Sequence, residues 1–289
     1  DYHSLIKNTD PAPTHSSSFE IAACWLACGL NPKEVVFYRQ SDVGHIFELA
    51  WILGCMTSKG LLNRAHAYKA AISDNETSNL NDIDKGVTMG LFNYPILMAA
   101  DILMFSADIV PVGQDQKQHI EMTRDIAGSF NHSYGDTLVL PEAKIDERVM
   151  IIPGTDGQKM SKSYNNFIDI FLPEKKLRKI VMGIVTDSTP LEEPKDADVC
   201  NVFKLYKLLG TEEQTAALRT QYEAGNFGYG HAKQALYELI LEKFAIQRER
   251  FNYLMENKEE IEKELQKGAE KARHIAKAVL QRVRQKVGY

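Results

Sequence analysis

The segment from Ile109 to Phe130 constrains the fold more than any other part of the chain. A short β-branched run over residues 109–112 ends at Gly113, and apolar residues then recur at helical spacing from about Gln116 to Phe130. A strand, a tight glycine turn and a helix in this order build a parallel sheet, and the turn directs backbone N–H groups towards an anion. Strands alternate with helices through residue 152, so the sequence predicts an α/β fold with a doubly wound, Rossmann-like parallel sheet.

The pattern changes in the second half of the chain. From Pro173 onwards we find helical periodicity and almost no strand. We therefore expect an α/β domain over residues 1–168, an all-helical domain over residues 169–270, and a C-terminal helix over residues 271–289 that packs back on the first domain. This last segment carries six Lys and Arg residues and no Asp or Glu. Its basic face either meets RNA phosphates or is a solvated face that suits the helix C-terminal dipole.

Local signals place further elements within the first domain. Residues 8–15 read as a loop, and the Ser17–Glu20 spacing is that of a capping box, which predicts a helix starting there. We expect this helix to turn the following side chains inward: Ile21, Cys24, Trp25 and Cys28. We also expect a buried strand over 35–38, a helix over 44–57, a mobile surface loop over 73–86, and a helix with Pro95 in its first turn.

Composition excludes several classes of protein. The net charge is −5, so any contact with nucleic acid has to come from local basic patches. The four cysteines are scattered, and Cys24 and Cys28, although they share a helix face, have no second pair at zinc-site spacing. We expect no metal site and a reducing cytoplasmic location. No run approaches membrane-spanning length and no signal peptide opens the chain, so we expect no membrane association.

Two clusters of residues indicate chemistry. Lys159-Met160-Ser161-Lys162-Ser163 follows a loop of turn-forming residues, and its two ammonium groups could follow a moving phosphate while its hydroxyls add donors. The alternative is a solvated basic loop. The second cluster is Tyr94, Met98 and Asp101, which are spaced to share one helix face. A carboxylate set among Ala99, Ala100 and Ile102 is expected to hold a ligand, the alternative being an exposed helix carboxylate.

Three segments together resemble bacterial-type tryptophanyl-tRNA synthetases, which belong to class I: YPILMAADIL (94–103), VPVGQDQKQH (110–119) and KMSKS (159–163). The resemblance extends over nearly the whole chain. It implies a two-step reaction, in which the tryptophan carboxylate attacks the α-phosphate of ATP and the tRNA ribose then takes the aminoacyl group. The protein forms no covalent bond, so catalysis would consist of positioning and charge stabilisation.

The resemblance implies a role for each matching residue. Asp101 would accept the indole N–H, with Tyr94, Met98 and Val110 as apolar walls, Gln116 on the amino or carboxylate group, and His3 nearby. ATP would contact a first set of residues: Gly113, Gln114, Asp115 and Val149. Lys159 and Lys162 would clamp the departing pyrophosphate with help from Mg²⁺, Ser161 and Ser163 would add contacts, and Met160 would anchor the loop. The family usually has Glu or Asp where this chain has Gln114.

The family's first signature, a His-Ile-Gly-His-like segment, is not in this sequence, and we expect it upstream of Asp1. The helical domain would recognise the anticodon of tRNA(Trp), and the enzyme would be a homodimer. Two other functions stay open: a tyrosyl-tRNA synthetase-like enzyme, against which the Ala-Ala-Asp segment argues, and a non-catalytic paralogue that binds RNA or protein, which intact KMSKS and Asp101 oppose.

Overall fold

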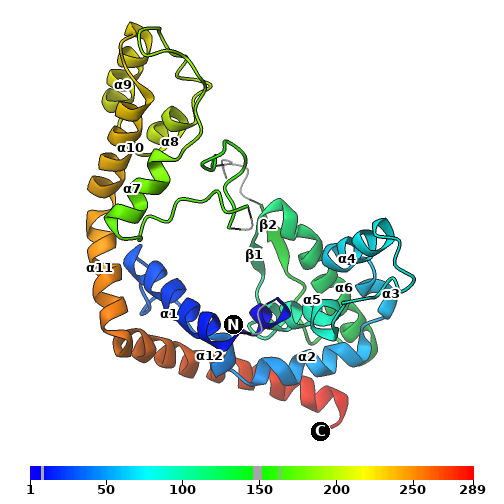
Figure 1. Ribbon diagram of the computed structural model, residues 1–289. Coiled ribbons are helices and arrows are strands. Elements are labelled where there is room, and N and C mark those ends of the chain that lie inside the picture. Colours follow the sequence, from blue (N-terminus) through cyan, green and yellow to red (C-terminus); the bar gives the residue numbers. More distant parts are fainter. Residues whose placement is uncertain (8–9, 146–151, 163) are drawn as a thin grey trace. The chain divides into compact units, whose positions relative to one another are not determined.

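The computed structural model describes residues 1–7, 10–145, 152–162 and 164–289 (Figure 1). The chain divides into two compact units. The first comprises Asp1–Ala22, Leu30–Glu147 and Asn257–Tyr289, and the second comprises Ala23–Gly29 and Arg148–Glu256. Among the described helices, none combines the length and apolar character that a membrane span requires. The functional domain limits at residues 168 and 270 stay predictions.

The first unit is built from helices around a small sheet. Its elements are η1 (Tyr2–Ile6), most of α1 (Pro11–Ala27), η2 (Gln40–Asp42), α2 (His45–Met56), α3 (Lys59–Leu62), α4 (His66–Thr77), α5 (Met89–Leu103), β1 (Ile109–Pro111), η3 (Gln114–Gln116), α6 (Lys117–Tyr134), β2 (Glu142–Lys144) and α12 (Lys258–Val287). β1 and β2 pair in parallel, with Ile109 opposite Glu142 and Pro111 opposite Lys144. The predicted parallel pairing, with a helix as the connection, is confirmed.

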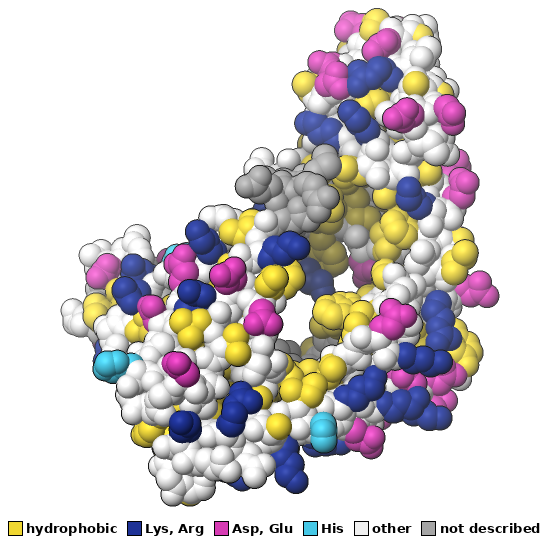
Figure 2. All heavy atoms as spheres, turned by 180° about the vertical axis from the view of Figure 1, so that it is seen from behind, with side chains coloured by type: hydrophobic (Ala, Val, Ile, Leu, Met, Phe, Trp, Pro, Cys, Tyr) yellow, Lys and Arg dark blue, Asp and Glu magenta, His cyan; other side chains and the backbone are white. Residues whose placement is uncertain are grey.

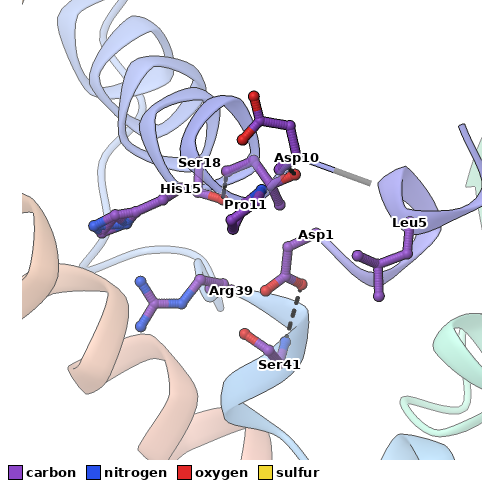
Figure 3. Close-up of a pocket in the computed structure, with 9 residues that line it drawn as sticks. Asp1, Leu5, Asp10, Pro11, His15, Ser18, Arg39 and Ser41 are labelled. Atoms are coloured by element: carbon purple, nitrogen blue, oxygen red, sulfur yellow. Dashed lines mark hydrogen bonds between the residues drawn. The ribbon is translucent and has the colours of Figure 1, made fainter. Parts of the chain in front are cut away.

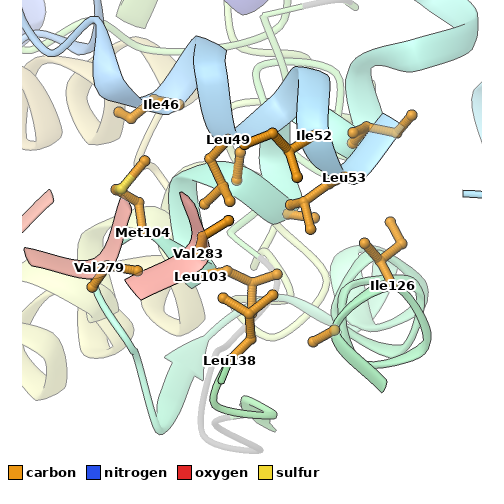
Figure 4. Packing of buried hydrophobic residues seen from close by; sticks show 14 of the residues in the cluster. Ile46, Leu49, Ile52, Leu53, Leu103, Met104, Ile126, Leu138, Val279 and Val283 are labelled. Atoms are coloured by element: carbon orange, nitrogen blue, oxygen red, sulfur yellow. The ribbon is translucent and has the colours of Figure 1, made fainter. Parts of the chain in front are cut away.

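The core of this unit lies between α2, α5, α6 and α12. Ile46, Leu49, Ile52 and Leu53 of α2 point towards Leu103 of α5, Ile126 of α6, and Val279 and Val283 of α12 (Figure 4). Full burial of each such side chain contributes about 1.5–3 kcal/mol. One face of α5 packs into the core through Ala99, Ala100 and Leu103. The opposite face of this helix does not take part in this core.

The predicted strand over residues 35–38 is wrong. Val35 and Val36 are exposed, and the only strands in the described residues are β1 and β2. The segment instead lies against α12, because a Cβ atom on Gly268 would stand 1.6 Å from the carbonyl oxygen of Phe37. A β-branched run needs a neighbouring strand to become one, and here its neighbour is a helix.

α1 begins at Pro11, six residues before the predicted capping box. The side chain of Asp10 accepts a hydrogen bond from the Ala12 N–H at 3.0 Å, and proline is favourable in a first turn, where its missing N–H costs nothing. The Ser18 hydroxyl donates to the Thr14 carbonyl at 3.0 Å. The capping-box pattern correctly indicated a helix in this region, but the helix begins earlier, at the favourable pair Asp10 and Pro11.

The predicted inward face of α1 is also wrong. Its buried side chains are Phe19, Ala22, Ala23 and Ala27. Ile21, Trp25 and Cys28 are exposed, and Cys24 is half-buried. The helix therefore packs through Phe19 and three alanines, while its largest side chain, Trp25, is 57% exposed.

Two further boundaries differ from the predictions. α5 begins at Met89, where the Thr88 side chain accepts from the Leu91 N–H, so Pro95 lies inside the helix and not in its first turn. Residues 73–77, predicted as loop, form the last turns of α4. The helix expected over residues 44–57 is confirmed as α2.

The second unit is helical beyond residue 173, as the periodicity predicts. Its helices are α7 (Glu174–Met182), α8 (Asn201–Leu209), α9 (Glu212–Ala224), α10 (Tyr229–Lys243) and α11 (Ala245–Glu256). They enclose a separate core centred on the buried side chains of Leu177, Phe203, Tyr222 and Leu236. A turn beginning at Gly225, whose φ is 74°, separates α9 from α10.

Candidate active site

The residues predicted to bind the amino acid lie on and around α5. Tyr94, Met98 and Asp101 are all half-buried, whereas their neighbours Ala99 and Ala100 are buried in the core. The spacing therefore separates a packing face from a face that is available for a ligand. Val110 on β1 and Gln116 in η3 are half-buried as well and belong to the same unit.

Asp101 is the best-supported polar group of this face. The Gln40 amide Nε2 donates to both Asp101 oxygens at 2.8 Å, and His3 Nε2 lies 3.0 Å from Oδ2. A carboxylate only accepts, so His3 Nε2 carries the hydrogen. The Asp101 side chain is 25% exposed. An ionised carboxylate has about four acceptor positions, which leaves room for one more donor beside these three contacts.

Gln40 is a residue that sequence reasoning missed. Its Oε1 accepts from the Tyr2 N–H at 3.2 Å while its Nε2 holds Asp101, so it links the segment carrying His3 to α5. No local pattern in the sequence marks it, since it follows Arg39 in a polar stretch. Burial raises the pKa of Tyr38 and the nearby Asp101 carboxylate raises it further.

A second contact orients Tyr94, the first of the three residues on this face of α5. The Tyr94 hydroxyl lies 3.0 Å from His119 Nε2, and His119 Nδ1 has no hydrogen-bond partner among the described groups. Burial lowers the pKa of His119, an effect that the neighbouring His66 reinforces. The neutral imidazole thus holds the Tyr94 ring in place, and His3 approaches the same ring edge-on at 6.4 Å between centroids.

The predicted ATP-contact turn connects β1 to α6. Gly113 precedes η3, and its carbonyl accepts from the Gln116 N–H at 2.9 Å. A Cβ atom at Gly113 would stand 2.7 Å from Asp115 Oδ1, so a larger residue here would displace the Asp115 carboxylate. Gln114 and Asp115 are exposed, and Gln116 Nε2 donates to Asp115 Oδ2 at 3.0 Å. The turn leads directly into the N-terminus of a helix, a position that favours anions.

The lysine motif lies in the second unit, in a tightly bonded loop that we call the KMSKS loop (residues 152–162 and 164–166). Pro153 and Lys159 form an antiparallel bridge, and the Met160 N–H donates to the Ile152 carbonyl at 2.9 Å. Met160 packs against the second core, while Lys159 and Lys162 are exposed. Val149 and Ser163, also predicted to contact ATP, lie outside the described residues.

The predicted residues that the structure describes are thus divided between the two units. The first unit holds the amino-acid group and the glycine turn: His3, Tyr94, Met98, Asp101, Val110, Gly113, Gln114, Asp115 and Gln116. The second unit holds Lys159, Met160, Ser161 and Lys162. Within the described residues no group of three or more His, Cys, Asp or Glu side chains is arranged to bind a metal ion.

A cavity of about 420 Å³ in the first unit is lined partly by residues next to this network in sequence (Figure 3). Arg39 enters it from beside Gln40, and its guanidinium binds the Glu262 carboxylate through two hydrogen bonds of 2.9 and 3.0 Å. This bond raises the pKa of Arg39. Its charge is therefore already compensated by α12, and the cavity itself lies between the segments of η1, α1 and η2 that line it.

The basic residues of α12 serve mainly to hold that helix in the first unit. Arg284 forms two bonds of 2.5 and 2.6 Å with the Glu48 carboxylate, Arg273 donates to the Asp42 carbonyl, and Lys271 donates to the Pro32 carbonyl. In Figure 2 Lys and Arg side chains lie along this helix, whose acidic residues are all Glu and precede residue 271. These cations are thus engaged within the protein, which weakens the hypothesis of a basic face reserved for RNA.

The sequence model described as "tRNA synthetases class I (W and Y)" matches residues 1–245. The chain belongs to this family. The tryptophan–tRNA ligase of Bordetella parapertussis is 52% identical, with 100% of this chain and 64% of that protein aligned. That of Neisseria meningitidis is 50% identical, with 100% and 85% aligned. The chain thus spans somewhat less than two thirds of the Bordetella relative.

A solved member of this class I family has the same fold. The tryptophanyl-tRNA synthetase of Campylobacter jejuni, crystallised with ADP and tryptophan, superposes with a TM-score of 0.92 at 46% identity, covering 100% of this chain and 88% of that one. The predicted fold class, a parallel-sheet α/β part with a helical C-terminal part, is therefore confirmed. The family description includes both tryptophan and tyrosine enzymes, whereas the Bordetella, Neisseria and Campylobacter proteins are named as tryptophan enzymes.

Proposed function

We propose that the protein is a tryptophan–tRNA ligase that works through a tryptophanyl-adenylate. The observation that carries this proposal is the half-buried Asp101 carboxylate on α5, held by Gln40 and His3 with an acceptor position left over. The indole N–H of tryptophan is the donor that this position suits. The names of the relatives in Bordetella and Neisseria support the same substrate.

Selection of tryptophan would rest on the hydrogen bond to Asp101. An amino acid without a ring N–H leaves the carboxylate short of its donor, and a site built in this way can reject such a competitor by about 10⁴-fold. Tyr94, Met98 and Val110 would supply the apolar walls, His3 would support the carboxylate, and Gln116 would hold the amino or carboxylate group.

In the first step an oxygen of the tryptophan carboxylate forms a bond to the α-phosphorus of ATP. The bond from that phosphorus to the bridging oxygen breaks, and pyrophosphate leaves with the electron pair. Gly113, Gln114 and Asp115 would receive ATP at the N-terminal end of α6, together with Val149. Lys159 and Lys162, with Ser161 and Ser163, would stabilise the negative charge that accumulates on the pyrophosphate, an effect of the kind that dominates phosphoryl and adenylyl transfer. In the second step a ribose hydroxyl of tRNA(Trp) attacks the acyl carbon and releases AMP.

Mg²⁺ would enter with the nucleotide. The described residues provide no cluster of carboxylates or histidines for it, and Mg²⁺ commonly binds through substrate phosphates and water. It would neutralise phosphate charge, and no protein group is assigned to it.

We further propose that the helical part over residues 169–270 recognises the anticodon. α7 carries the exposed residues Lys175, Lys176 and Lys179, which suit contacts with a phosphate backbone. The terminal segment over residues 271–289 would pack on the α/β domain, consistent with the hydrogen bonds from its arginines to residues there. With four cysteines and no disulfide, a cytoplasmic location fits best.

ATP–pyrophosphate exchange on the full-length protein tests the proposal. Exchange that depends on tryptophan, followed by charging of tRNA(Trp), is the expected result. Exchange with tyrosine alone would instead identify a tyrosyl enzyme. Exchange with neither amino acid would leave the non-catalytic paralogue as the better description.

A homodimer is the proposed assembly. A groove of about 530 Å³ between α2 and α5 is lined mainly by apolar residues, and Trp51 on its edge is 75% exposed. Aromatic side chains of this kind are enriched in the centres of protein interfaces. We expect Trp51→Glu to convert a dimer to a monomer in sedimentation experiments. If the wild type sediments as a monomer at micromolar concentration, or if the variant stays dimeric, this interface is wrong.

A further inference from the structure

Asn166 is a polar residue buried in the KMSKS loop that sequence analysis did not single out. Asn166 is only 2% exposed. It lies three positions after the last residue of the lysine motif, in a part of the chain where the neighbouring Asn165 is exposed. A buried amide is costly unless its hydrogen-bonding groups are satisfied. The contacts that Asn166 makes therefore indicate what the residue is for.

The Asn166 side chain joins the two sides of the lysine motif. Its Oδ1 accepts from the Ser161 N–H at 2.7 Å, and its Nδ2 donates to the Lys159 carbonyl at 3.1 Å. The second Nδ2 hydrogen goes to Asp156 Oδ1 at 2.8 Å. Both donors and the acceptor of the amide are thus used, and two of the three bonds go to the backbone on either side of Met160.

The rest of the loop is shaped around this amide. A Cβ atom on Gly154 would stand 2.5 Å from the Asn166 amide, so only glycine permits the approach. The Thr155 N–H donates to the Asn166 carbonyl at 2.8 Å. The bond from Nδ2 lowers the pKa of Asp156, which keeps this carboxylate ionised as an acceptor. Asn166 is therefore the centre of the loop and not a passive surface residue.

We propose that Asn166 is a positioning residue for adenylation. It holds the backbone at Lys159 and Ser161 in the conformation that presents the two exposed ammonium groups to the leaving pyrophosphate, and it touches no substrate itself. Fixing the backbone leaves only side-chain freedom to be lost when the lysines bind, and a displacement of about 1 Å can reduce a rate by about 10²-fold. The inference rests on the proposed role of the lysines in adenylation.

The activity test uses Asn166→Ala and Asn166→Asp. Asn166→Asp keeps the acceptor for Ser161 but turns a carboxylate oxygen towards Asp156 and the Lys159 carbonyl. We expect kcat for ATP–pyrophosphate exchange to fall by about 10²-fold in both variants while KM for tryptophan is unchanged. Adding Asp156→Asn to Asn166→Asp restores a donor–acceptor pair between these positions and should recover part of kcat.

Asn165→Gly is the matched control, because Asn165 is exposed and has a φ of 52° that glycine adopts freely.

A second measurement does not depend on catalysis. The amide hydrogen of Ser161 should exchange with solvent about five-fold faster, or more, in Asn166→Ala, as expected for the loss of one hydrogen bond. If the wild type shows no tryptophan-dependent exchange of pyrophosphate, the proposed function fails, while this amide measurement still reports on the loop. If the wild type is active and the Asn166 variants retain its kcat, or lose kcat and tryptophan binding in parallel, the positioning role is refuted. An unchanged exchange rate at Ser161 refutes it as well.

Discussion

Replacing Asp101 with alanine is the most direct test of how the protein selects its amino acid. The substitution removes a carboxylate that accepts two contacts of 2.8 Å from Gln40 and one of 3.0 Å from His3. Because the side chain is 25% exposed, water can reach the abandoned donors, and we expect a stability loss of only about 1 kcal/mol. The variant should therefore fold, so its kinetics can be interpreted.

The expected kinetic loss follows from the missing partner of the indole N–H. A hydrogen bond to a charged group contributes about 1.5–3 kcal/mol, which corresponds to roughly a 10- to 150-fold loss in kcat/KM for tryptophan. KM for ATP should be nearly unchanged, since the glycine turn and the lysines are intact. Asp108→Asn is the matched control, because Asp108 is an exposed acid shortly after α5.

Pyrophosphate exchange at varied tryptophan and varied ATP provides the assay, with thermal unfolding as a check on folding. If Asp101→Ala weakens tryptophan and ATP use to the same degree, Asp101 is a structural residue and the selection argument is refuted. A loss of the same size in Asp108→Asn would refute it too, because the effect would then be one of general charge.

Three further predictions concern the phosphate clamp, the packing of α12 and the buried histidine. Lys159→Ala should lower kcat for adenylation by about 10²-fold with little change in tryptophan affinity, and an unchanged rate in rapid-quench experiments would remove the clamp role. Gly268→Ala should destabilise the protein by about 3 kcal/mol or more, because its Cβ would stand 1.6 Å from the Phe37 carbonyl oxygen. Gly128→Ala, whose Cβ would meet nothing within 4 Å, should instead stabilise α6 by about 0.5–1 kcal/mol, and equal melting temperatures for the two variants would contradict the packing. Burial lowers the pKa of His119 in the folded protein. Below the ordinary histidine pKa of about 6.5 the unfolded chain therefore binds more protons than the folded protein, so the free energy of unfolding falls as the pH decreases through that range. We expect denaturant unfolding of His119→Gln to depend less on pH between about 7 and 5 than that of the wild type, whereas parallel pH profiles would show that His119 does not contribute.

Short-range patterns predicted the elements that depend on local spacing. The helix over residues 44–57, the strand at 109–111 and the helical second half follow from periodicity, because the apolar residues that a helix or strand buries repeat at its own period. The face shared by Tyr94, Met98 and Asp101 follows in the same way from the helical repeat. Local signals failed where two of them competed, as at α1, whose start at Asp10 and Pro11 took precedence over the later capping box.

Contacts between distant segments could not be read from the chain. Gln40 lies 61 positions from Asp101, and nothing in its neighbours distinguishes it from a surface glutamine. Asn166 is only five positions from Ser161, yet its burial depends on how the loop closes around Gly154. The run at 35–38 has the composition of a strand, but its neighbour proved to be the helix that carries Gly268.

By itself the sequence determined the candidates for the chemistry: the carboxylate on a helix, the glycine turn after a strand and the pair of lysines. Only the tertiary structure decided which groups hold them in place, namely Gln40 and His3 on Asp101, His119 on Tyr94 and Asn166 beneath the lysines. The physical reason is that helix and strand periods are set by local backbone geometry, whereas a hydrogen bond between distant segments forms only after the cores have packed and excluded water around it.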